Sequence, residues 1–63
     1  MLKISLKAAR VNKGMSQVEA AKAMGVSKST LISWELGKTS PTVSKLTALC
    51  DLYEIPLKNI ALR

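Results

Sequence analysis

The sequence predicts an all-α domain, and three observations lead to this expectation. Apolar residues recur at helical spacing in several short segments, whereas no segment shows the alternation typical of a strand. Serine or threonine precedes most of these segments, and glycine follows several of them, as at helix ends. The chain has 63 residues, 48% of them hydrophobic, which is enough for one small core. We therefore expect a compact domain of five helices that covers residues 1–63.

The first helix is expected at residues 5–13, with Ser5 as its N-cap. Its spacing places Leu6, Ala9 and Arg10 on one inward face. An arginine buried without a partner would be costly, so Arg10 is expected to meet a carboxylate.

Two further short helices are expected at residues 17–24 and 28–35, with a tight turn between them at Gly25. Ser16 is a suitable N-cap for the first of the two. Gly25 can take the left-handed conformation that ends a helix. Two helices this short and this closely joined are typical of a helix-turn-helix, which we assign to residues 16–37.

The tryptophan in the second of these helices has two possible roles. Trp34 shares a helix face with Leu31, which would pack it against the small residues Ala20 and Ala21. An exposed aromatic ring could instead stack on a nucleic-acid base. The spacing favours the core position.

A fourth helix is expected at residues 43–53, capped by Thr42. A short fifth helix is expected at residues 57–60, packed onto the core by Leu57 and Ile60. Pro56 separates the two helices. The apolar spacing of the fourth helix makes Cys50 a small core residue, because a reactive thiol needs an electropositive and partly exposed setting.

Composition limits the function further. The net charge of +6 predicts a polyanionic partner, either a nucleic acid or an acidic membrane surface, and the helix-turn-helix favours double-stranded DNA. One cysteine and no histidine leave too few ligands for a structural zinc site, and the four carboxylates form no catalytic set. We expect no metal, cofactor, small-molecule substrate or enzymatic activity. With no long apolar run and no signal peptide, we expect a cytoplasmic protein without a membrane partner.

The pattern resembles the phage repressor and Cro-like (XRE-type) helix-turn-helix family. The resemblance extends over nearly the whole chain and is carried by Arg10, Gln17, Ala21, Gly25, Val26, Ser27, Leu31, Trp34, Glu35, Gly37, Pro41 and the stretch 46–62. It implies a sequence-specific DNA-binding regulator that acts on an operator in a bacterial or phage-infected cell. It also implies that Arg10 pairs with Glu35. Two alternatives remain open: a protein-interaction or antitoxin-like module, and the DNA-binding domain of a longer repressor.

Base contacts are expected from the helix at residues 28–35, because the N-terminal half of this helix enters the major groove in such motifs. The candidate residues are Ser27, Lys28, Ser29, Ile32 and Ser33. Lys28 can donate to guanine O6 and N7, and Ile32 could contact a thymine methyl group. Since these side chains are mostly short, apolar contact, water and DNA shape should contribute to recognition.

Phosphate contacts are expected at both ends of the helix-turn-helix. Gln17 matches the family position whose side chain holds a phosphate. Lys38, Thr39 and Ser40, in the loop after the third helix, are expected to bind the DNA backbone.

A homodimer is expected on DNA, because one such domain covers about one half-site. The surface expected to form it lies near the C-terminal end of the chain. It consists of Leu52, Leu57, Lys58, Asn59 and Leu62. We expect the free protein to be largely monomeric.

Overall fold

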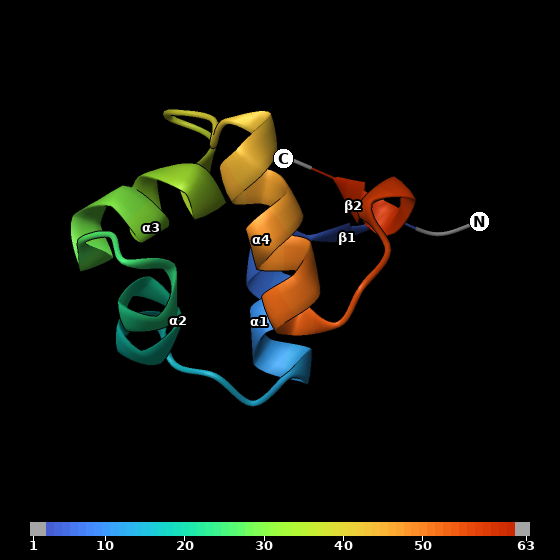
Figure 1. Cartoon of the computed structure of the whole chain (residues 1–63), viewed down its shortest axis with the longest axis horizontal. Helices are drawn as coiled ribbons and strands as arrows, with labels where there is room; N and C mark the ends of the chain where they lie inside the picture. The colour runs from blue at the N-terminus through green and yellow to red at the C-terminus, as the bar shows by residue number, and fades with distance from the viewer. Residues whose placement is uncertain (1–2, 62–63) are drawn as a thin grey trace.

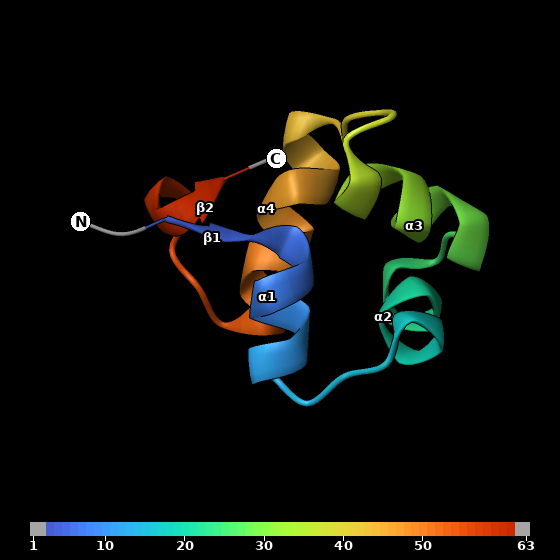
Figure 2. The same ribbon diagram turned by 180° about the vertical axis from the view of Figure 1, so that it is seen from behind.

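The computed structural model describes residues 3–61. This part of the chain contains four α-helices, one 3-10 helix and two short strands. In chain order they are β1 (Ile4–Ser5), α1 (Leu6–Asn12), α2 (Gln17–Met24), α3 (Lys28–Leu36), α4 (Val43–Tyr53), η1 (Leu57–Asn59) and β2 (Ile60–Ala61). Figure 1 shows α1 and α4 at the centre, α2 and α3 on one side of them, and the strands on the other. The reverse view in Figure 2 shows the same arrangement with α1 in front.

Each α-helix begins at a residue whose hydroxyl oxygen accepts a backbone N–H of the first turn. These N-cap residues are Ser5, Ser16, Ser27 and Thr42. At α2, Glu19 completes a capping box, since its carboxylate accepts the backbone N–H of Ser16 at 2.8 Å. This bond, with a second from the Ser16 side chain, holds the pKa of Glu19 below its ordinary value.

The four α-helices also end alike, with a residue in the left-handed conformation just after the last turn. Three of these residues are Gly14, Gly25 and Gly37, with φ angles of 77°, 70° and 77°. The fourth is Glu54, with a φ of 56°. After each of them, the next backbone N–H donates to the carbonyl five residues earlier, as in a Schellman motif. Only Glu54 carries a side chain in this conformation, which costs roughly 1–2 kcal/mol.

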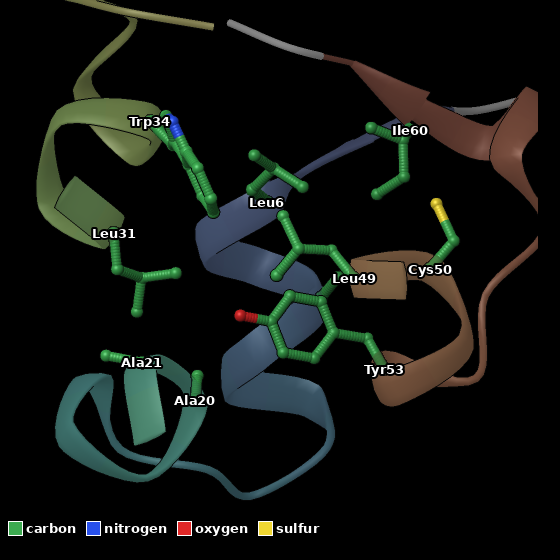
Figure 3. Close-up of a cluster of buried hydrophobic side chains, with 10 residues drawn as sticks. Leu6, Ala20, Ala21, Leu31, Trp34, Leu49, Cys50, Tyr53 and Ile60 are labelled. Carbon is green, nitrogen blue, oxygen red and sulfur yellow. The ribbon is translucent and has the colours of Figure 1, made fainter. Parts of the chain in front are cut away.

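The core lies between the four α-helices and β2. Its buried members are Leu6, Ala9, Ala20, Ala21, Leu31, Trp34, Leu49, Cys50, Tyr53 and Ile60. Figure 3 shows Leu31 and Trp34 pointing from α3 into this interior. The core positions predicted for Trp34 and Cys50 are therefore confirmed. Burial raises the pKa of the Cys50 thiol, as expected of a core cysteine.

The prediction of a fifth α-helix is wrong, and so is the prediction that the chain has no strand. After Pro56 the chain makes only a 3-10 turn at Leu57–Asn59, and then becomes extended. The extended segment pairs in parallel with β1, with Ile4 opposite Ile60. Strands of two residues are too short to display an alternating pattern, and these two come from opposite ends of the chain.

Smaller differences concern helix bounds and one leucine. The first helix is shorter than the expected 5–13 by one residue at each end. The third extends one residue beyond the expected 28–35, to Leu36, whereas the second and fourth have the expected bounds. Leu57 was expected to pack the last helix onto the core, but it is exposed, and Ile60 alone of that pair is buried.

Candidate nucleic-acid interface

The helix-turn-helix of α2 and α3 is held together from inside. The small side chains of Ala20 and Ala21 allow α2 to approach α3, and Leu31 of α3 fills the space above them (Figure 3). In the turn, the backbone N–H of Val26 donates to the carbonyl of Ala21 at 3.0 Å. Because Leu31 and Trp34 occupy the inner face of α3, its opposite face is left at the edge of the molecule (Figure 1).

The five residues predicted to contact bases lie in or next to the first two turns of α3. Ser27, Lys28 and Ser29 are exposed, and Ile32 and Ser33 are half-buried. The hydroxyl oxygen of Ser27 accepts the backbone N–H of Thr30 at 3.1 Å, and lies 2.9 Å from the Thr30 hydroxyl. Ser27 therefore caps the helix, whatever else it contacts.

Thr30 is a polar residue near this face that sequence reasoning overlooked. Its hydroxyl and that of Ser27 form a pair in which either oxygen can be the donor. Ser27 and Thr30 are three residues apart, the spacing of an N-cap and its partner. That spacing is the signal that could have identified the pair.

The predicted phosphate-binding residues lie at the start of α2 and in the loop between α3 and α4. The Gln17 side chain is half-buried, and its Nε2 donates one hydrogen bond to Glu35 Oε1 at 3.3 Å. Lys38, Thr39 and Ser40 are exposed. The backbone N–H groups of Lys38 and Thr39 donate to the Ser33 carbonyl at 3.0 and 3.4 Å. Because these two backbone N–H groups are already hydrogen-bonded, an anion at this loop would be bound mainly by side chains.

A buried ion pair connects the helices behind α3. Arg10 Nε of α1 donates to Glu35 Oε2 at 2.8 Å, and the two side chains are only 9% and 4% exposed. Arg10 Nη1 also donates to the Met15 carbonyl at 2.8 Å, in the loop before α2. With Gln17 on the same carboxylate, Glu35 joins α1, α2 and α3.

Tyr53 of α4 lies close to this ion pair but is not bonded to it. Its hydroxyl points toward α2 and α3 in Figure 3, is buried, and has no hydrogen-bond partner among residues 3–61. Burial raises the pKa of Tyr53 to about 12, with Glu35 adding to the rise and Arg10 opposing it. The phenol is therefore neutral at ordinary pH.

The lysines of the candidate interface carry charge that no carboxylate of the described chain neutralises. The two ion pairs found in residues 3–61 are Arg10–Glu35 and Lys13–Glu54. Neither involves Lys28 or Lys38. Both cations are therefore available to an anionic partner.

The residues predicted for the dimer surface differ in exposure. Leu57 is 48% exposed and Lys58 is exposed. Leu52 is half-buried and packs against the core, and Asn59 is half-buried with its Oδ1 buried and unpartnered among residues 3–61. Leu62 lies outside the described residues.

Two other kinds of site are absent from residues 3–61. This part of the chain contains no cluster of three cysteine or carboxylate side chains that could hold a metal ion. None of its helices has the length and apolarity needed to cross a membrane.

Comparison with known proteins identifies the family. A helix-turn-helix family model matches residues 6–60. The chain is also similar to the cryptic phage CTXphi transcriptional repressor RstR of Vibrio cholerae, with 31% identity over 51 residues. The match covers 81% of this chain and 46% of that repressor, so the chain spans about half the length of the relative. No solved structure matches. On the family match over most of its length, this chain belongs to the XRE-type helix-turn-helix family of phage repressors and Cro-like proteins.

Proposed function

We propose that this protein binds double-stranded DNA in a sequence-specific manner and regulates transcription by occupying an operator. The observation that carries the proposal is the family match over residues 6–60, together with a helix-turn-helix whose α3 leaves its polar face free. The similarity to a phage transcriptional repressor supports a regulatory role. The net charge of +6 suits a DNA partner.

Sequence recognition is assigned to α3 in the major groove. Lys28, Ser29 and Ser33 bring donors, and the serines also bring acceptors, to the outer side of this helix. Ile32 brings an aliphatic group to the same side. The Ser27 hydroxyl oxygen accepts a hydrogen bond from the backbone N–H of Thr30. Ser27 would therefore contact DNA through the donor and the second lone pair of its hydroxyl group, which this cap does not use. The occupied operator would then limit access of the polymerase.

Binding to phosphates is assigned to Gln17, Lys38, Thr39 and Ser40. The Gln17 amide has two N–H groups, and the hydrogen bond to Glu35 uses one of them. The second N–H is left for a phosphate at the start of α2, where the helix dipole also favours an anion. Lys38 is exposed and belongs to neither ion pair of residues 3–61, so it can neutralise a phosphate on the other side of α3.

Dimerisation on DNA is assigned to the surface around Leu57 and Lys58. Leu57 is one of the large exposed hydrophobic residues, and Lys58 lies beside it in η1. Leu52 and Asn59 are more covered and would contribute at the edge of the contact. Such a surface is small, which agrees with association that needs DNA as a template.

Selection from a random pool of duplex DNA, followed by sequencing, tests the proposed function. We expect enrichment of one related set of sites, bound at least about 10³-fold more tightly than unrelated duplex. The same pool offered as single strands is the control and should yield no enriched sequence. Failure to enrich any duplex sequence would refute sequence-specific DNA binding.

A further inference from the structure

Leu36 is an exposed leucine at the end of α3 that does not belong to the buried core. It is the last residue of α3, and 58% of it is exposed. At about 100° per residue, it lies roughly 140° around the helix axis from Leu31 and roughly 160° from Trp34. Since those two side chains point into the core, Leu36 points away from it.

Leu36 and Ile32 form a continuous apolar strip on the outer face of α3. They are four residues apart, and side chains at that spacing are neighbours on a helix surface. By the same helical geometry, Ser29 and Ser33 lie on one side of this strip and Lys28 lies on the other. An aliphatic pair at the centre of an otherwise polar face has an unfavourable contact with water, which burial against an apolar group of a partner would remove.

We propose that Ile32 and Leu36 recognise the C5-methyl groups of thymines in the major groove. This inference rests on the proposed DNA binding by α3. In the major groove, the C5-methyl group is the feature of a base pair that offers apolar contact. The strip thus adds Leu36 as a specificity-determining residue, and predicts operators with a thymine at the position that it meets.

The charges around the strip favour DNA over a second protein copy as the occupant. Lys28 lies one turn before Ile32, and Lys38 follows Leu36 by two residues. Neither lysine belongs to the ion pairs found in residues 3–61. Two copies that met through this face would bring like charges together, whereas a duplex would bring phosphates to both ends of the strip.

The test replaces single thymines of a selected operator with uracil, which removes only the C5-methyl group. For the parent protein, we expect at least one position at which uracil lowers the affinity about three- to tenfold, as expected for one buried methyl group. Leu36→Ala should lower the affinity for the thymine operator by a similar factor, and should no longer distinguish thymine from uracil at that position.

Two further variants serve as controls. Val11→Ala truncates a side chain that is similarly exposed (57%) but lies on α1, so its affinity and its uracil response should equal those of the parent. Leu36→Met keeps an apolar side chain and should retain the uracil response. Thermal melts of all three variants should match the parent, because the altered side chains are exposed.

The outcomes separate this inference from the proposed function. Equal binding to thymine and uracil at every position would overturn the methyl contact while leaving DNA binding intact. A Leu36→Ala protein that still responded to uracil like the parent at each position would remove Leu36 from the contact. If the parent protein bound no duplex specifically, the proposed function and this inference would both fail.

Discussion

The Arg10–Glu35 ion pair joins α1 to the helix-turn-helix, in addition to the packing of the shared core. Its carboxylate also holds Gln17, and its guanidinium also holds the Met15 carbonyl. Because both side chains are almost fully buried, neither charge can turn to water if its partner is removed. Removing one partner therefore costs more free energy than the intact pair contributes to the net stability of the fold.

Glu35→Gln should accordingly destabilise the protein by about 3–5 kcal/mol, since it leaves the Arg10 charge buried without a counter-charge. A domain of this size has little stability to lose, so the variant could unfold outright. Chemical denaturation of the parent and the variant measures the change. The matched control is Lys13→Ala, which breaks the exposed pair with Glu54 and should cost no more than about 1 kcal/mol. A Glu35→Gln protein that melted within a degree or two of the parent would contradict the buried pair.

Tyr53→Phe tests a different buried group. The Tyr53 hydroxyl has no partner among residues 3–61, so its removal breaks no hydrogen bond that the structure contains. We expect the variant to be as stable as the parent, or more stable by about 1 kcal/mol, because an unsatisfied buried hydroxyl no longer has to be desolvated. A loss of stability well above 1 kcal/mol in the same denaturation experiment would mean that the hydroxyl is bonded.

Among the secondary-structure elements, the four α-helices can be compared by the residue that follows their last turn. Three α-helices are followed by a left-handed glycine, and α4 is followed by a left-handed Glu54. Glu54→Gly should therefore stabilise the protein by about 0.5–1 kcal/mol, by relieving the contact between Cβ and the backbone. Loss of the exposed pair with Lys13 offsets little of this gain.

Glu54→Ala is the matched control for that substitution, since it removes the same carboxylate but keeps the Cβ. Its stability should not exceed that of the parent. Equal stabilisation by alanine and glycine would assign the effect to the lost charge, and would contradict the account of a strained backbone at Glu54.

How far each element could be predicted from the sequence depends on how local its determinants are. α2 and α4 have the expected bounds because Ser16, Gly25 and Thr42 mark their ends within the sequence itself. α3 runs one residue further than expected, to Leu36, and Gly37 ends it in the left-handed conformation. The strand pair could not be predicted, since its stability depends on an encounter between the two ends of the chain.

In the candidate site too, features set by local spacing could be predicted, and contacts between distant residues could not. The outward position of Lys28 and Ser29 follows from helical spacing alone, so the sequence sufficed for it. The hydrogen bond between Gln17 and Glu35 joins residues on different helices, so no local sequence pattern predicts it. Leu36 was overlooked because the expected helix stopped before it. Which bases these side chains meet stays a prediction.

For the whole molecule, the net charge of +6 should make the proposed binding to DNA depend on salt concentration. Lys38→Ala should weaken binding to specific and unrelated duplex alike. It should also make the slope of log affinity against log salt concentration shallower by about one, because one fewer counterion is released. Lys13→Ala is the control, since the Lys13 charge is paired with Glu54, and its slope should equal that of the parent. A parental slope for Lys38→Ala would remove Lys38 from the interface.

The dimer is the second prediction for the whole molecule. Sedimentation should find the free protein largely monomeric at micromolar concentration, because Leu57 and its neighbours form only a small apolar surface. Footprinting on a selected operator should find two protected half-sites about 34–36 Å apart, filled cooperatively. Leu57→Ala should weaken the cooperativity and leave binding to one half-site unchanged. Protection of a single half-site at every protein concentration would refute the dimer.

If the outer face of α3 reads DNA sequence, its polar side chains must contribute to operator affinity, and one titration measures this contribution. The affinities of the parent and of a Lys28→Ala, Ser33→Ala double variant are measured on a selected operator and on unrelated duplex, with melting curves as a check on folding. Both side chains lie outside the core, so the fold should persist. We expect a loss of about 1–3 kcal/mol in operator binding for each true base contact, and a smaller loss on unrelated duplex. A folded double variant with parental affinity for the operator would contradict this role of α3.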